Sequence, residues 1–215
     1  ESNRIASMSC SGGEASLIAD MAHDTPLTFP PLTDQQRSGL STALGPKVAL
    51  ANPLDYHTYI WRDTDAMTRA FSAMISPEIA ITFLIVDFPR SDICDDTDWD
   101  CAIHSAINTR AATNGTIAMV ATLPELMPEH VAQRLMDGGI IPLAGLHEAL
   151  GATVAAQTQS PCDSDVIVPT PTRDAATLSE ATAKADLSAF GITVPDLWVG
   201  DLSDLASKAS TSDGP

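Results

Sequence analysis

The fold of this chain is decided by residues 79–86, which read IAITFLIV. The run is almost continuously apolar and is the length of a single strand. Strands of this kind are covered on both faces, as they are in parallel sheets with helices above and below. We therefore predict that residues 79–86 form the central strand of a parallel sheet, which ends at Asp87.

On both sides of this strand, short apolar runs alternate with segments of helical spacing. Expected strands are residues 4–10, 47–50, 116–120 and 140–142. Thr33 is expected to cap a helix over residues 34–44, and Asp63 or Thr64 to cap a helix that runs through Met74. The other expected helices are residues 14–23, 96–112, 128–138 and 146–156. The alternation predicts the α/β class: a flavodoxin-like, doubly wound parallel sheet of five strands in the order 2-1-3-4-5. In this fold, ligands gather at the carboxyl ends of strands 1 and 3.

The composition changes after the last of these helices. Residues 157–177 carry several prolines among many serine, threonine and aspartate residues, which is typical of a linker. We therefore predict a domain over residues 1–156, a linker over 157–177 and a separate segment over 178–215. The last segment is expected to hold a helix over residues 178–190, a β-like stretch at 192–195 and a frayed end after Val199.

The charge of the chain excludes several classes of partner. The net charge is -17, with 28 acidic against 11 basic residues. Because no cluster of lysine and arginine exists to neutralise a phosphate backbone, we expect no nucleic-acid binding. The apolar runs are too short to span a bilayer, and no signal peptide precedes them, so we expect a cytoplasmic protein without membrane contact. The first residue is Glu1, which predicts that upstream residues are missing or removed.

No metal site is expected. The cysteines and histidines lack ligand spacing. The acidic run between Asp92 and Asp100 lacks the glycine and distal glutamate of a calcium loop, and its position indicates favourable charge at a helix start. Asp87 lies where a receiver domain has its phosphoacceptor, but the chain lacks the acidic pair and the lysine that such a domain needs to hold Mg²⁺.

The strongest local signal is the sequence Ser11-Gly12-Gly13 between a predicted strand and a predicted helix. Glycine allows a tight turn and a close approach of a ligand to the backbone. The helix behind it presents free N–H groups and the positive end of its dipole, which favours phosphate. His57 is a second candidate, because its proline-containing loop is predicted at the carboxyl edge of the sheet.

Several segments, in their order and spacing, resemble a known family. The matching segments are 3–6 (NRIA), 11–13 (SGG), 17–20 (LIAD), 52–55 (NPLD), 85–87 (IVD), 178–180 (LSE), 183–184 (AK) and 190–195 (FGITVP). Together they resemble the third, flavodoxin-like CoA-ligase domain of NDP-forming acyl-CoA synthetases, the superfamily of succinyl-CoA synthetase. The last three segments are similar to the start of the ATP-grasp domain, so residues 178–215 would be its truncated beginning.

The resemblance implies part of a ligase that converts a carboxylic acid, CoA and ATP into acyl-CoA, ADP and phosphate. The route runs through an acyl phosphate and a phosphohistidine that belongs to the preceding domain and has no match here. Partners would be the CoA-binding, phosphohistidine and ATP-grasp domains of the same enzyme, and a small carboxylic acid. CoA and Mg-ATP would be substrates of the parent enzyme, and the isolated chain would bind neither tightly and be inactive.

By the same resemblance, Gly12, Gly13 and the N–H groups of Glu14 and Ala15 would hold phosphate. Family members often have a neutral residue after the two glycines, whereas this chain has Glu14. A carboxylate at this position must point away from the phosphate or weaken its binding.

The resemblance also implies a border for the acyl-phosphate site, formed by Asn52, Asp55 and the loop that contains Phe88 and Arg90. His57 and Arg90 are not general features of the family. We expect them to set the acid specificity, with Arg90 pairing with a substrate carboxylate.

Two alternatives remain open on the sequence. One is a non-catalytic flavodoxin-like module that binds a small anion or a partner protein. The other is a flavodoxin that binds FMN, which would need a hydroxyl-rich phosphate loop and flanking aromatic residues. Ser9 and Ser11 are consistent with such a loop, but the Gly12-Gly13 turn and the ATP-grasp-like tail argue against it.

Overall fold

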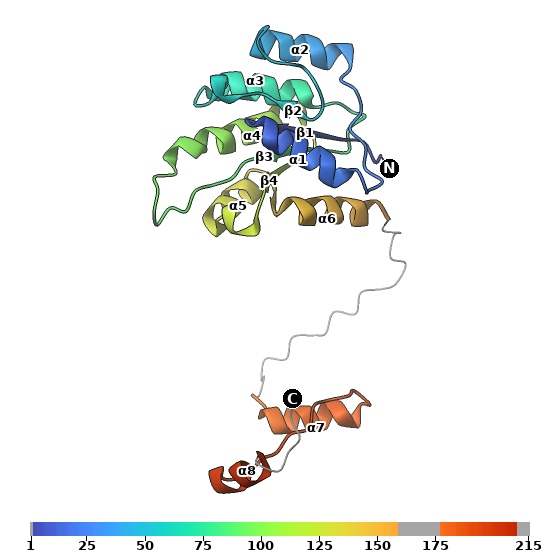
Figure 1. Ribbon diagram of the computed structural model, residues 1–215, viewed down its shortest axis with the longest axis vertical. Coiled ribbons are helices and arrows are strands. Elements are labelled where there is room, and N and C mark those ends of the chain that lie inside the picture. Colours follow the sequence, from blue (N-terminus) through green and yellow to red (C-terminus); the bar gives the residue numbers. More distant parts are fainter. Residues whose placement is uncertain (1, 159–176, 210–215) are drawn as a thin grey trace. The chain divides into compact units, whose positions relative to one another are not determined.

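The first of two compact units in the chain, Glu1–Cys162, contains a sheet of five parallel strands (Figure 1). The computed structural model describes residues 2–158 and 177–209. The strands are β1 (Ile5–Ser9), β2 (Leu54–Asp55), β3 (Ile81–Ile85), β4 (Ile117–Ala121) and β5 (Ile141–Ala144). Their order is β2-β1-β3-β4-β5, with β3 at the centre. This confirms the flavodoxin-like α/β fold and the central position predicted for residues 79–86.

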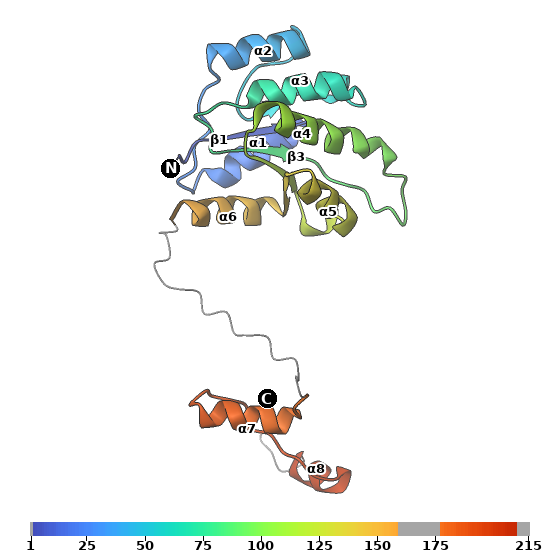
Figure 2. The same cartoon turned by 180° about the vertical axis from the view of Figure 1, so that it is seen from behind.

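Helices cover both faces of the sheet (Figures 1 and 2). They are α1 (Gly12–Ala22), α2 (Asp34–Leu44), α3 (Thr64–Met74), α4 (Asp100–Thr113), α5 (Glu129–Asp137) and α6 (Leu146–Thr158), with 3-10 turns η1 (Thr58–Ile60), η2 (Thr97–Trp99) and η3 (Pro124–Leu126). Helices α1 and α6 pack on one face. Helices α3, α4 and α5 pack on the other, and α2 lies against α3.

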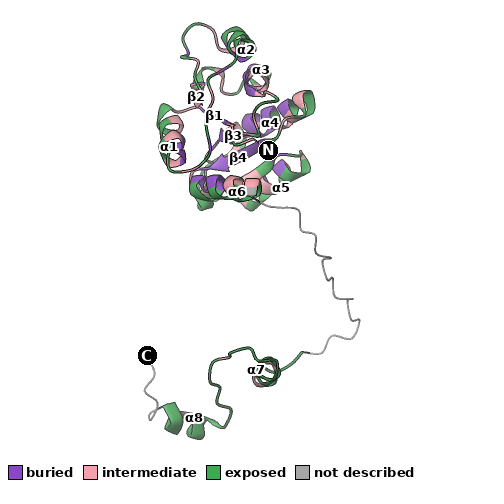
Figure 3. Cartoon of the chain, turned by 90° about the vertical axis from the view of Figure 1, so that its right-hand side faces the viewer, coloured by how far each residue is buried: buried purple, intermediate pink, exposed green. Residues whose placement is uncertain are grey.

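The alternation of side chains along the central strands produces two hydrophobic cores. Phe83 and Ile85 of β3 pack with α1 and α6, whereas Leu84 points to the opposite core with Met67 of α3 and Ile103 of α4. The central strands are accordingly buried (Figure 3). Burial on both faces is the reason that β3 reads as a continuous apolar run in the sequence.

The helix starts follow the capping residues that the sequence indicates. The Thr33 hydroxyl accepts a hydrogen bond from the N–H of Gln36, and the Gln36 side chain accepts one from the N–H of Thr33 at 2.9 Å. This reciprocal capping box starts α2. Asp63 starts α3 in a similar way, since its carboxylate accepts from the N–H of Ala66 at 2.9 Å.

The second unit, Asp163–Pro215, corrects two expectations. It contains α7 (Glu180–Ala189), which confirms the predicted helix, and α8 (Leu202–Ala209), in place of the predicted frayed end. The Asp201 carboxylate accepts the N–H of Asp204 at 3.0 Å and so caps α8, a signal that sequence reasoning missed. Residues 192–195 form no strand. Of the predicted linker, residues 159–176 lie outside the described part of the chain, and 157–158 belong to α6.

The prediction of a second strand at residues 47–50 was wrong, because β2 is the shorter segment Leu54–Asp55. The Asn52 side chain occupies the edge of β1 that a longer strand would use. Its amide oxygen accepts the N–H of Ser7 at 3.1 Å, and its NH₂ group donates to the carbonyl of Ile5 at 3.0 Å. A second donation reaches the carbonyl of Pro30 at 3.1 Å. One side chain therefore replaces strand pairing and ties down the preceding loop.

Replacing Asn52 with alanine should lower the free energy of unfolding by about 2–4 kcal/mol, because backbone groups of β1 lose their partners inside the protein. Chemical denaturation of the chain measures this change. Asn108→Ala on the exposed surface of α4 is the matched control and should change stability by less than about 0.5 kcal/mol. Equal effects of the two substitutions would contradict the role given to Asn52.

Candidate functional site

The carboxyl ends of β1, β2 and β3 meet at one edge of the sheet. In the parallel register, Ser9 pairs with Asp55 and Met8 pairs with Leu84, so the three strands end side by side. The segments that follow them therefore come together at this edge. It is the edge at which the strand order reverses between β1 and β3, where ligands bind in doubly wound folds.

Helix α1 starts at Gly12, two residues earlier than predicted, so both glycines belong to its first turn. Ser11 is the N-cap residue, but its side chain makes no capping hydrogen bond. The N–H of Ala15 donates to the carbonyl of Ser11 at 3.1 Å and is taken up by the helix. In the described part of the chain, the N–H groups of Gly12, Gly13 and Glu14 have no acceptor. These groups are the free donors at the positive end of α1.

The two glycines differ in the space around them. A side chain at Gly12 would place its Cβ 3.2 Å from the Asp55 Oδ2, so a close approach to β2 favours glycine there. A Cβ at Gly13 would lie 3.5 Å from the Ser11 hydroxyl, which is an ordinary contact. The fold itself therefore has room for a side chain at Gly13.

Glu14 lies in an acidic environment at the start of α1. Partial burial, followed by the negative charges of Asp87 and Asp55, raises the pKa of Glu14 to about 7. Its buried Oε2 has no hydrogen-bond partner in the described part of the chain. Burial and then the charge of Glu14 also raise the pKa of the neighbouring Cys10 thiol. A phosphate at this helix start would meet carboxylates as well as N–H groups.

Asp55 and Asp87 are both bonded to neighbouring residues. One oxygen of Asp55 accepts the N–H of His57 at 2.9 Å, and the other lies 3.5 Å from the His57 Nδ1. Asp87 accepts the N–H of Thr122 at 2.7 Å and the Thr122 hydroxyl at 2.6 Å, which joins the ends of β3 and β4. His57 has a positive φ of 60° and a partly exposed ring, and its hydrogen bond to Asp55 at the end of β2 places it at this edge, as predicted.

Three other sequence candidates have evident structural roles. The Asn52 amide is fully used by backbone groups of β1 and the preceding loop. The Phe88 side chain is 2% exposed and belongs to the core. Arg90 is exposed and forms a two-pronged ion pair with Asp92, with N–O distances of 2.6 and 3.0 Å.

A cavity of about 290 Å³ opens beside the start of α1. It is lined by Cys10, Glu14, Thr58, Trp61, Ile85, Val86, Asp87 and Trp99. Sequence reasoning missed both Trp61, which follows β2 in the same loop as His57, and Trp99 as residues of a site. The two rings pack edge to face with their centroids 6.1 Å apart. They belong to segments far apart in the sequence, so no local pattern could pair them.

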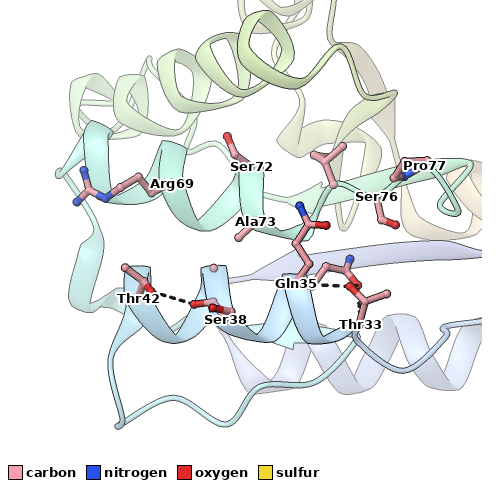
Figure 4. Close-up of a pocket in the computed structure, with 12 residues that line it drawn as sticks. Thr33, Gln35, Ser38, Thr42, Arg69, Ser72, Ala73, Ser76 and Pro77 are labelled. Carbon is pink, nitrogen blue, oxygen red and sulfur yellow. Dashed lines mark hydrogen bonds between the residues drawn. The ribbon is translucent and has the colours of Figure 1, made fainter.

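A larger hollow of about 470 Å³ lies between α2 and α3, away from this edge (Figure 4). Short polar side chains such as Ser38, Thr42 and Ser72 line it, and Arg69 is the only charged residue among the described residues of its lining. A Cβ at Gly39 would lie 2.9 Å from the Cβ of Ala73, which shows how closely the two helices approach. The hollow is a consequence of small residues at a helix contact.

Acidic residues between Asp92 and Asp100 pair with basic side chains of other segments. Asp98 binds Arg62, Asp96 lies 3.4 Å from His130, and Asp100 lies 2.7 Å from Arg134. No cluster of three or more potential metal ligands occurs within residues 2–158 and 177–209. Within the same ranges, no helix has the length and apolar character needed to cross a bilayer.

Comparisons with solved structures show where this fold occurs. The chain resembles PH0766 from Pyrococcus horikoshii OT3 with a TM-score of 0.58 and 19% identity over 72% of this chain. It resembles the dinucleotide forming acetyl-coenzyme A synthetase 1 of Ca. Korarchaeum cryptofilum with a TM-score of 0.54 and 15% identity over 73% of this chain. The latter is known in apo form and in complex with phosphate and ADP.

These likenesses establish a shared fold. The chain spans only 35% and 33% of the length of the two proteins. No protein-family model and no curated protein matches the sequence. The chain thus shares its fold with one part of an acetyl-coenzyme A synthetase, and the likeness extends to the fold alone.

The raised pKa of Glu14 predicts a pH-dependent effect of Glu14→Gln on stability. The folded-state pKa lies above the ordinary value of 4.5, so the wild-type chain loses stability relative to the variant as the pH rises from 4.5 through 7. Since the side chain is only partly buried, we expect the variant to be more stable by about 1 kcal/mol at pH 8. Denaturation at pH 4 and pH 8 measures the difference.

The titratable groups near Glu14 are Asp55, Asp87, Cys10 and Tyr56. Asp20→Asn on the exposed side of α1 removes a comparable charge and serves as the control. An advantage of Glu14→Gln that is the same at both pH values would show that folding does not shift the pKa of Glu14.

Proposed function

We propose that this chain is part of an NDP-forming acyl-CoA synthetase and that α1 contributes one wall of its phosphate-transfer site. The free N–H groups of Gly12, Gly13 and Glu14 carry the proposal, because they lie at the ligand-binding edge of a fold shared with an acetyl-coenzyme A synthetase. N–H groups at a helix start stabilise the charge of a phosphoryl group. The motifs of residues 3–20 and 52–55 support the same assignment.

In this function, the parent enzyme joins a carboxylic acid to CoA as ATP is converted to ADP and phosphate. The phosphohistidine and the CoA and Mg-ATP sites belong to other domains of that enzyme, and residues 178–215 begin the ATP-grasp domain. The role of this chain is to hold and orient the phosphoryl group. A Cβ at Gly13 would make only an ordinary contact with the Ser11 hydroxyl, and its absence suits a close approach of phosphate oxygens to the backbone.

The carboxylates at this edge explain why α1 alone is not sufficient to bind phosphate tightly. Coulomb attraction cannot draw an anion to a chain of charge -17, so binding depends on local dipoles. Glu14, Asp55 and Asp87 oppose the dipole of α1 at short range. We therefore expect millimolar binding of inorganic phosphate at best, until a facing segment from another domain completes the site.

Replacing Gly13 with valine in the full-length enzyme should slow phosphorylation of its histidine by at least about tenfold, or 1.4 kcal/mol. The branched side chain would occupy the phosphate position, whereas the contact inside the domain is an ordinary one. Rapid-quench measurement of phosphate transfer from labelled ATP tests this.

Gly151→Val is the matched control. Gly151 is exposed on α6, a Cβ at this position would have no other atom within 4 Å, and the residue lies far from the helix start in sequence. A normal phosphorylation rate in Gly13→Val would contradict phosphate binding by the Gly12-Gly13 segment and leave it a purely structural role.

The isolated chain should form no acyl-CoA from ATP, CoA and a panel of acids, since it holds only one wall of the proposed site. Mass spectrometry should also find no phosphate on any of its five histidines. Phosphorylation of one of them would contradict the assignment of the phosphohistidine to another domain.

A further inference from the structure

The cavity beside α1 has an apolar and aromatic interior. Trp61 and Trp99 form one wall with their edge-to-face contact, and Ile85 and Val86 from the end of β3 form another. Its volume of about 290 Å³ is close to the lower end of the range for small-molecule pockets, about 300–1,000 Å³. Acetate, whose organic part is a single methyl group, would leave most of this space empty.

An ion pair links the two segments that carry the aromatic wall of Trp61 and Trp99. Arg62, directly after Trp61, binds the carboxylate of Asp98, directly before Trp99. Arg62 has a positive φ of 73°, which is uncommon for a residue with a side chain. The Cys101 thiol also donates to the carbonyl of Asp98 at 3.1 Å. The Arg62–Asp98 ion pair thus joins the two segments that carry Trp61 and Trp99, and the two rings are themselves in contact.

The polar groups that line the cavity are Glu14 and Asp87, which lie near each other, Cys10, and Thr58 in the loop after β2. The Oε2 of Glu14 is buried there without a partner in the described part of the chain, and a protonated carboxyl group at this position can donate a hydrogen bond to a carboxylate. No lysine or arginine is among the described residues that line the cavity, and Arg62 and Arg90 pair with Asp98 and Asp92. A second carboxylate deep in the cavity would be buried without a counter-ion, at high cost.

We propose that this cavity binds the organic part of the acid substrate, and that the substrate is an aromatic monocarboxylic acid of the size of phenylacetate. Its ring would lie against Trp61 and Trp99, and its carboxylate would face Glu14 and the first turn of α1. The inference rests on the proposed function for the identity of the ligand as an acid substrate. Acetate and dicarboxylic acids are excluded as the preferred substrates, because they leave the cavity empty or bury an unpaired charge.

Binding can be measured on the chain itself without any turnover. A Trp198→Phe background leaves Trp61 and Trp99 as the only tryptophans, so their fluorescence reports on the cavity. Phenylacetate should quench it with saturation, at concentrations at least tenfold lower than acetate or succinate. In the same background, Trp99→Ala should weaken phenylacetate binding about tenfold, measured by calorimetry.

A second variant tests the cavity in case Trp99→Ala fails to fold. Thr58 is exposed at the cavity, so Thr58→Phe adds a ring to the cavity with little disturbance of the core. It should also weaken phenylacetate binding about tenfold. Equal affinity for phenylacetate and acetate in the Trp198→Phe chain, or normal binding in both cavity variants, would overturn the proposal.

Assays of the full-length enzyme separate this inference from the proposed function. The value of kcat/KM for phenylacetate should exceed that for acetate at least tenfold, and Thr58→Phe should reverse this preference. Turnover of acetate without binding of phenylacetate would support the ligase and overturn the aromatic pocket. Saturable phenylacetate binding without acyl-CoA formation from any acid would support the pocket and contradict the ligase.

Discussion

The parallel pairing of β1 with β3 is the constraint on which the rest of the structure depends. Ile5 pairs with Ile81 and Met8 with Leu84, so both strands end at the same level of the sheet. This register brings the start of α1 next to Asp87, although more than seventy residues separate them along the chain. Hydrophobic cores on both faces fix the register, because a shift by one residue would turn apolar side chains to the wrong face.

On the other side of β1, an amide side chain replaces most of a strand. Asn52 binds both the N–H of Ser7 and the carbonyl of Ile5, and β2 then pairs for only two residues. The short β2 allows the chain to leave the sheet early and form the loop that carries His57 and Trp61. The aromatic wall of the cavity thus depends on a backbone arrangement that Asn52 maintains.

The sequence predicted those parts of the fold that depend on local patterns. The apolar run of β3, the caps Thr33 and Asp63 and the glycines at the start of α1 have local physical causes, and each was found. The β2 strand was misplaced because the hydrogen bonds between Asn52 and β1 join residues 45 and 47 positions apart. Likewise, the Trp61–Trp99 contact and the environment of Glu14 arise only when loops from different strands meet, and no periodicity records them.

The raised pKa of Glu14 has a consequence for the thermodynamics of ligand binding. Near neutral pH this carboxyl group is close to half protonated, and a second negative charge beside it would favour the protonated form. An anion that binds at the start of α1 would therefore take up part of a proton from solvent. The binding enthalpy would then depend on the ionisation enthalpy of the buffer, and the net charge added to the site would be smaller than the charge of the ligand.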